Sequence, residues 1–361
     1  MSAGLDRLAA RAEAIRAPLS ALFELTGRCN LDCGHCYLDI AHPPDEMSTA
    51  DAIRVVDALA DAGTLFLTLT GGELFLRPDA LEIAAHARRR GMALRLFTNG
   101  TRITRALAAE IARVRPLAVE ISIYGSHADA HDGVVKRRRT LRRTLRGIVL
   151  LRRAGVSVAL KAPLLSTVTG ELDRLYALAD RVGAKIAFDP FVKPRNDAGA
   201  APFALRAGSA DLARALAHPR MGIVAAGLSP PPSGDEAPCA IGRRTTKISP
   251  TGDVYACPSH PEPLGNLLRT PFSRLWAGGE VLDRLRSVRW RDLHGDCAGC
   301  GQAGYCNRCT AVALLEHGDA LGPAREACRI ADAKEQALGV PTRAHRAAER
   351  SGAQVRLHVL R

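Results

Sequence analysis

Three cysteines, Cys29, Cys33 and Cys36, share one short stretch at the spacing C-x3-C-x2-C. They follow the apolar run 21–23, which predicts a strand that leads into a polar loop. At this spacing one loop wraps around a single inorganic centre with all three thiolates pointing inward. A structural zinc site closes with a fourth ligand, whereas an iron–sulfur cube held by three cysteines keeps one iron free. We therefore predict a cluster with an open iron; the alternatives are a zinc knuckle and a few buried thiols.

Seven more cysteines lie from residue 239 onward. The first two are spaced C-x12-G-x4-C, the next four C-x2-C-x5-C-x2-C, and one more follows: Cys239, Cys257, Cys297, Cys300, Cys306, Cys309 and Cys328. Ten cysteines without a secretion signal favour a reducing compartment and metal ligation over disulfides. The alternative of a zinc ribbon uses only Cys297, Cys300, Cys306 and Cys309 and leaves the other three unexplained.

The elements that must position these residues alternate along the chain. Short apolar runs and helix-length segments take turns between residues 20 and 191, which predicts βαβ units and a parallel sheet. The expected strands are 21–25, 65–70, 93–98, 117–123, 156–161 and 185–189. The expected helices are 49–62, 79–90, 102–114, 140–154 and 171–182. Six such units make an open, partial (β/α)6 barrel, so the predicted fold class is α/β.

Changes in composition divide the chain into segments. We expect a polar N-terminal segment (1–19), the barrel (20–191), a Pro- and Gly-rich linker with one short helix (192–238), a small Cys-rich domain (239–330) and a helical tail (331–361). Within the Cys-rich domain, residues 245–257 predict a β-hairpin that turns at 250–252 and positions Cys257.

Polar residues and glycines cluster at the ends of the expected strands, where parallel α/β folds place their working residues. In chain order they are Gly71, Gly72, Glu73, Asn99, Ser122, Lys161 and Asp189. Two glycines allow a backbone to approach a ligand closely, and a carboxylate can receive an ammonium group. Each residue alone also fits a turn or packing role, and Asp189 fits either a substrate contact or a helix cap.

Composition bounds the protein class. The chain has 361 residues, 47% hydrophobic and 24% charged, which is ordinary for a globular protein. No apolar run reaches the roughly 20 residues of a membrane span, and residues 1–18 contain no signal peptide, so we expect a cytoplasmic protein without a membrane partner. The net charge of +13 permits nucleic-acid or acidic-peptide binding, but 4% aromatics is poor material for base stacking.

The cysteine loop, with Tyr37 directly after its last cysteine, resembles the signature of the radical S-adenosylmethionine (SAM) enzymes. The Gly71-Gly72-Glu73 turn, one βα unit later, is similar to the motif that holds the amino group of SAM in that family. The resemblance implies that the free iron binds SAM and that one electron cleaves SAM to methionine and a 5′-deoxyadenosyl radical. It also implies cofactor-binding roles for Tyr37, Gly71, Gly72, Glu73, Asn99, Ser122 and Lys161.

The C-terminal cysteines resemble the SPASM extension of that family. The resemblance implies two auxiliary [4Fe–4S] clusters, hence three in all: one held by Cys239, Cys257 and Cys309, the other by Cys297, Cys300, Cys306 and Cys328. The chain departs from the family pattern because two residues, not three, separate Cys306 from Cys309. The first auxiliary cluster lacks an obvious fourth cysteine; its last ligand is water, another side chain or the substrate.

The function implied by the resemblance is hydrogen-atom abstraction from a substrate, above all in a ribosomally made peptide that is crosslinked or epimerised. The alternatives are a tetrapyrrole of haem synthesis, sulfatase maturation and, in another class, a zinc- and nucleic-acid-binding module. The expected partners are a peptide substrate and an electron donor such as flavodoxin or ferredoxin. Because residues 1–19 leave no room for a recognition domain, a leader peptide is expected to need a separate recognition protein or the barrel's own surface.

A basic run at 136–146 remains outside these motifs, starting with Lys136-Arg137-Arg138-Arg139. One interpretation is a solvated helix face. The other is an electrostatic patch for an acidic peptide or a redox partner.

Overall fold

One mixed sheet organises the computed structural model, which describes residues 3–38, 42–43, 45–223 and 230–339. Its first six strands are β1 (Ser20–Glu24), β2 (Phe66–Thr70), β3 (Ala93–Thr98), β4 (Ala118–Ser122), β5 (Val158–Pro163) and β6 (Lys185–Asp189). Each is parallel to its neighbours, so all six carboxyl ends lie at one edge. The order β6-β5-β4-β3-β2-β1-β7-β8-β9 does not close on itself. The predicted α/β class with a partial barrel is confirmed.

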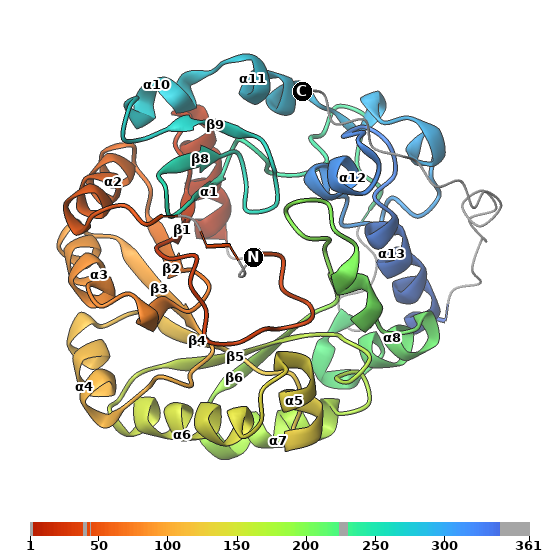
Figure 1. Ribbon diagram of the computed structural model, residues 1–361. Coiled ribbons are helices and arrows are strands. Elements are labelled where there is room, and N and C mark those ends of the chain that lie inside the picture. The colour runs from red at the N-terminus through yellow and green to blue at the C-terminus, as the bar shows by residue number, and fades with distance from the viewer. Residues whose placement is uncertain (1–2, 39–41, 44, 224–229, 340–361) are drawn as a thin grey trace.

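Helices cover the outer face of the barrel in Figure 1. They are α2 (Thr49–Asp61), α3 (Ala80–Arg89), α4 (Arg105–Val114), α6 (Thr140–Arg153) and α7 (Leu172–Val182). The expected helical segments match these five within a few residues. Helix starts are set by capping: Ser48 Oγ accepts from the Asp51 N–H at 3.1 Å and Thr104 Oγ1 from the Leu107 N–H at 3.1 Å.

The barrel core is aliphatic. Leu67, Leu69, Leu94, Leu96 and Ile121 are fully buried on the strands. Burial at this level contributes roughly 1.5–3 kcal/mol per side chain relative to exposure. The strand ends can therefore carry polar residues because the middle of each strand supplies the stability.

The C-terminal part joins the barrel through the same sheet. The strand β7 (Thr245–Ile248) is parallel to β1, and β8 (Asp253–Tyr255) and β9 (Pro263–Asn266) follow antiparallel. The hairpin predicted at 245–257 is present, but its pairing with β1 was not predicted. Consequently the first cysteine loop, which follows β1, and the turn of the hairpin before Cys257, which follows β7, begin at adjacent strands of the sheet.

The remaining helices surround the open side of the barrel, where α8, α12 and α13 lie together in Figure 1. They are α8 (Ser209–Leu216), α10 (Phe272–Ala277), α11 (Glu280–Ser287), α12 (Thr310–His317) and α13 (Arg325–Ala337). Short 3-10 turns occupy Leu74–Leu76, Ala201–Leu205, Pro219–Met221, Trp290–Asp292 and Gly295–Cys297. Five helices of the described residues were not predicted: α1 (Ala3–Ala14) in the N-terminal segment, α5 (Ala128–Val135) at the mouth of the barrel, and α10, α11 and α12 in the Cys-rich domain.

The expected tail falls partly outside the described residues. Its first residues belong to α13, and 340–361 are not described. Within the described ranges, every helix is too short or too polar to cross a bilayer.

Candidate active site

The loop after β1 brings its three cysteines together. The loop leaves the sheet after Leu25, whose N–H donates to Thr70 O at 2.8 Å. Within the loop, the Cys36 N–H donates to Cys33 O at 3.0 Å. Burial raises the pKa of the Cys33 thiol, and the neighbouring Cys36 and Cys29 raise it further. Burial and Cys36 act on Cys29 in the same direction. Three coupled, half-buried thiols in one loop are a soft donor set that fits an iron–sulfur cluster.

The glycine pair after β2 holds this loop against the sheet. The Gly72 N–H donates to Thr26 O at 2.9 Å, and the Glu73 N–H donates to Arg28 O at 2.8 Å. A Cβ on Gly71 would lie 2.4 Å from Thr26 O, and one on Gly72 would lie 2.4 Å from Arg28 O. Only glycine fits either position. The predicted close approach is present, but the backbone that approaches belongs to the cysteine loop.

The Glu73 carboxylate is buried and already bonded. Its Oε1 accepts from Thr98 Oγ1 at 2.6 Å and from the Phe75 N–H at 3.2 Å, and its Oε2 accepts from the Asn99 N–H at 2.8 Å. Burial raises the pKa of Glu73, and these hydrogen bonds offset only part of that rise. A carboxylate offers about four acceptor positions, so one remains for an ammonium group. Glu73 therefore joins the ends of β2 and β3 whether or not it also binds a ligand.

Asn99 connects the end of β3 to the cysteine loop. Its Nδ2 donates to Asn30 Oδ1 at 2.9 Å, and its Oδ1 accepts from Thr101 Oγ1 at 2.6 Å. Asn30 Nδ2 in turn donates a hydrogen bond to Thr101 Oγ1 at 2.9 Å. This three-residue ring fixes the residue beside Cys29.

Ser122 reaches the same loop through Tyr124. The Tyr124 hydroxyl interacts with both Ser122 and the Cys33 thiol, and its ring lies 4.6 Å from that of His35. Burial lowers the pKa of His35 to about 4, so its imidazole is neutral near pH 7. Tyr124 and His35 were not predicted as site residues; the only signal was their position beside the cysteines and the fourth strand end.

A cavity of about 730 Å³ joins these strand ends to the C-terminal cysteines. Its walls include Tyr37 from the cysteine loop, Ser122 from the end of β4, Lys161 from β5, and Cys309. Lys161 Nζ pairs with Glu120 Oε2 at 3.2 Å. Asp189 lines the cavity as predicted, but its Oδ1 also accepts from the Phe191 N–H at 2.9 Å. No helix begins directly after Asp189 in the described residues, so the helix-cap interpretation is wrong, and the substrate contact stays a prediction.

Lys193 is a cavity residue that the sequence analysis assigned to the linker. Its Nζ lies 3.6 Å from the centre of the Tyr37 ring and 3.4 Å from Ser259 Oγ. Burial lowers its pKa to about 8, with a contribution from Lys247. Among the described residues, no carboxylate lies within ion-pair distance of this ammonium. The cavity therefore holds one cation without an acidic partner, between the first cysteine loop and Cys309.

The C-terminal cysteines divide into two groups in space. Cys239, Cys257 and Cys309 act on one another electrostatically, and burial raises the pKa of Cys257 to about 11. The second group consists of Cys297, Cys300, Cys306 and Cys328, which line a separate small cavity. Cys309 lies with the first group, so the four cysteines of the zinc-ribbon alternative are not neighbours of one another.

A buried arginine faces the second group. The Arg308 side chain is 4% exposed, and its Nη2 donates to Ala320 O at 2.8 Å and to Gly322 O. Its Nε and Nη1 are buried without a hydrogen-bond partner in the described ranges, and the guanidinium partly offsets the burial that raises the pKa of Cys297. An unpaired buried cation is costly. A cluster ligated by four thiolates is anionic, so this site fits the group that the spacing predicts.

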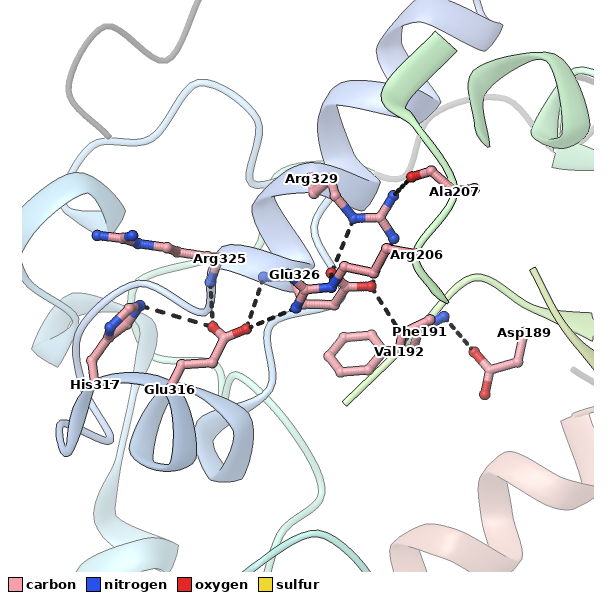
Figure 2. A network of polar contacts seen from close by, with 10 residues as sticks. All are labelled: Asp189, Phe191, Val192, Arg206, Ala207, Glu316, His317, Arg325, Glu326 and Arg329. Carbon is pink, nitrogen blue, oxygen red and sulfur yellow. Dashed lines mark hydrogen bonds and ion pairs between the residues drawn. The ribbon is translucent and has the colours of Figure 1, made fainter. Parts of the chain in front are cut away.

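A buried ion network, drawn in Figure 2, connects the α12–α13 region to the segment that follows β6. Glu326 at the start of α13 is fully buried and pairs with Arg206 at 2.9 Å and Arg329 at 2.7 Å. Its Oε1 also accepts from the Val192 N–H at 3.0 Å, next to Lys193. Glu316 of α12 pairs with Arg206 at 3.4 Å. The helix that carries Cys328 is therefore fixed to the segment that follows β6.

Comparison with known proteins agrees with this architecture. The family model of the radical SAM superfamily matches residues 23–179, and that of the SPASM iron–sulfur cluster-binding domain matches residues 239–310. The AdoMet-dependent heme synthase of Methanosarcina barkeri is 29% identical over 335 residues, which are 84% of this chain and 95% of that protein. The mycofactocin maturase MftC of Mycolicibacterium smegmatis is 30% identical over 311 residues, 80% of this chain and 77% of the maturase.

A solved structure with the same fold is SuiB from Streptococcus suis bound to its precursor peptide SuiA. The two folds superpose with a TM-score of 0.70 at 15% identity, over 88% of this chain and 78% of SuiB.

Proposed function

Because this chain belongs to the radical SAM superfamily and carries a SPASM domain, we propose that it is a peptide-modifying enzyme. Its cofactors are [4Fe–4S] clusters and SAM. When bound, these supply a 5′-deoxyadenosyl radical that abstracts a hydrogen atom from the substrate. The observation that carries the proposal is the cavity of about 730 Å³ between the first cysteine loop and Cys309.

In this proposal Cys29, Cys33 and Cys36 ligate the SAM cluster. Tyr37 and Gly71 to Glu73 shape the pocket for SAM, with the glycines acting through the loop backbone. Asn99 and Ser122 orient the pocket through Asn30 and Tyr124, and Lys161 faces the cavity beside Glu120. In this arrangement the polar residues at the strand ends bind and orient SAM. The apolar side chains of the barrel core exclude water from beneath the pocket.

The auxiliary groups take different roles. Cys239, Cys257 and Cys309 ligate a cluster at the cavity wall, with a fourth position open to water, another side chain or the substrate. Cys297, Cys300, Cys306 and Cys328 ligate a closed cluster whose negative charge Arg308 compensates. Asp189 and Lys193 line the space left for the substrate.

The charges in the cavity favour a peptide substrate. Two lysines and two carboxylates line it, and Lys161 is already paired with Glu120. A peptide brings amides and single charges, which such a mixed lining can bind. A tetrapyrrole brings several carboxylates, for which only Lys193 remains without an acidic partner in the described part. The heme synthase relative keeps the tetrapyrrole as the second candidate.

The proposed partners are a ribosomally made precursor peptide, a flavodoxin or ferredoxin as electron donor, and a separate protein that recognises the leader of the precursor. We place the enzyme in the cytoplasm, since no cysteine forms a disulfide in the part of the chain that the structure describes, and a reducing compartment favours metal ligation by such cysteines.

The test of the SAM site is direct. Each of Cys29→Ala, Cys33→Ala and Cys36→Ala should abolish 5′-deoxyadenosine formation after dithionite reduction of the anaerobically reconstituted protein. Iron should remain in the C-terminal region of each variant. Wild-type 5′-deoxyadenosine from any of the three would contradict the assignment. A precursor peptide encoded beside the gene of this enzyme and a tetrapyrrole are each incubated with the wild-type enzyme. Mass spectrometry then shows which of the two candidate substrates is modified.

A further inference from the structure

Five exposed arginines form a cationic stripe on the turn before α6 and on its first turns: Arg138, Arg139, Arg142, Arg143 and Arg146. None of these side chains bonds to a residue in the described part of the chain. Other clustered arginines differ: Arg243, Arg286 and Arg289 each donate to main-chain carbonyls. The arginines of the stripe therefore do not serve to hold the chain together.

The stripe opposes the stability of its own helix. Arg142 and Arg146 stand four residues apart within α6, and Arg143 and Arg146 stand three apart, where like charges destabilise a helix. The first turn of α6 carries no acidic residue, so its cations also oppose the helix dipole. Nearby Asp132 is engaged, since its Oδ1 accepts the Thr140 and Leu141 N–H groups. The remaining carboxylate of the adjoining hollow is Asp129, so the face is strongly positive.

The chain places this face beside the SAM cluster loop. The Gly34 N–H donates to Val134 O at 2.9 Å, at the end of α5. Arg137 donates to Asn30 O at 2.5 Å, and Lys136 pairs with Asp32 at 3.4 Å. The basic turn thus rests on the residues between the cysteines.

The inner face of α6 reaches the same site. Thr144 Oγ1 donates to Asn99 O at 2.9 Å, and a Cβ on Gly147 would lie 2.3 Å from Gly100 O. An α-helix with its side chains is about 10–12 Å across. The outward arginines of the stripe therefore lie roughly one helix width from the Asn99 cradle.

We propose that the cationic stripe is the docking surface for the acidic electron donor that reduces the SAM cluster, a flavodoxin or a ferredoxin. This proposal rests on the proposed radical SAM function. One electron passes from the donor to the cluster, so the donor is oxidised as the cluster is reduced. Flavodoxins and ferredoxins are small acidic proteins, and a complementary positive face steers their association.

The test compares two triple charge reversals with the same net change. The stripe variant is Arg142→Glu/Arg143→Glu/Arg146→Glu. The control variant is Arg113→Glu/Arg153→Glu/Arg181→Glu, exposed positions in the last turns of α4, α6 and α7, away from the strand carboxyl ends. We measure 5′-deoxyadenosine formation by the full reconstituted chain, once with enzymatically reduced flavodoxin and once with dithionite, at low and high salt.

The stripe variant should lose at least tenfold of its flavodoxin-driven rate at low salt and keep its dithionite-driven rate, whereas the control variant keeps both. High salt should reduce the difference in flavodoxin-driven rate between the wild type and the stripe variant. An unchanged flavodoxin-driven rate, an equal loss in the control, or a loss with dithionite as well would overturn the docking surface. If the triple variant is not soluble, Arg146→Glu alone is measured in the same way. Absence of dithionite-driven 5′-deoxyadenosine in the wild type would instead contradict the radical SAM function.

Discussion

The two auxiliary cysteine groups differ in what surrounds them. Cys309 of the first group lines the large cavity, and the nearby cation, Lys193, is half-buried and faces that space. The second group lines a small cavity of its own, and its cation, Arg308, is buried. The three-thiol group thus meets an open space through Cys309, whereas all four thiols of the second group line one small cavity.

This difference teaches how one small domain can carry two kinds of metal centre. A centre with four protein ligands and a buried counter-cation is suited to structure or electron storage. A centre with three ligands at a cavity wall keeps one position for chemistry, as catalytic metal sites generally do. The following predictions test whether the two groups divide the work in this way.

The largest expected effect is on folding. Cys306→Ala removes a thiol from the closed group, and a small loop-rich domain depends on its metal centre for stability. Most of the soluble yield should be lost. Cys239→Ala, the matched change in the open group, should retain its soluble yield. Anaerobic purification with iron analysis of both variants checks this, and equal yields would erase the structural half of the comparison.

The next effect is on catalysis. Cys239→Ala should still form 5′-deoxyadenosine from SAM, because the SAM cluster has its own loop, but product formation should fall to background. Both quantities are measured on the same preparation with the same substrate. Product at the wild-type rate would mean that the open group has no catalytic role.

The sequence predicted the barrel well because its signals are local. Alternating apolar runs and helical segments gave the six strands and five outer helices, and the carboxyl-end rule placed Ser122, Lys161 and Asp189 on one cavity. The grouping of cysteines came from resemblance, since spacing alone left a zinc ribbon possible.

The parts that were missed depend on contacts between distant segments. The pairing of β7 with β1 joins residues more than two hundred positions apart, which no local pattern records. Lys193 looked like a linker residue because its role depends on Tyr37 and Ser259. Glu73 looked like a ligand contact, and only the structure revealed its bonds to Thr98 and Asn99.

A third prediction concerns the ion network that fixes the closed group. Glu326→Gln leaves Arg206 and Arg329 without their buried carboxylate, which should cost about 3–5 kcal/mol in the free energy of unfolding. Asp180→Asn is the control, because its pair with Arg220 is exposed and its loss should leave the free energy of unfolding nearly unchanged. Chemical denaturation of the reconstituted variants gives both values. Similar costs for the two would show that Glu326 is not the anchor of this junction.

The last prediction concerns Lys193 at the open group. Its ammonium has only the Ser259 hydroxyl and the Tyr37 ring as partners in the described part, so a substrate carbonyl or carboxylate can complete its bonding. Lys193→Met should lose about 1.5–3 kcal/mol of substrate binding, a roughly ten- to hundredfold rise in KM, while 5′-deoxyadenosine formation without substrate is unchanged.

The pH dependence separates this charge effect from simple packing. The pKa of Lys193 is lowered to about 8, so the wild-type ammonium is present below that pH and lost above it. The wild-type KM should therefore rise as the pH passes through about 8. Lys193→Arg stays charged throughout and should keep a low KM across this range, whereas Lys193→Met should show a high and flat one. A rise in KM of the same size in the Arg variant would assign the effect to another group, and the open site would then lack a cation that binds substrate.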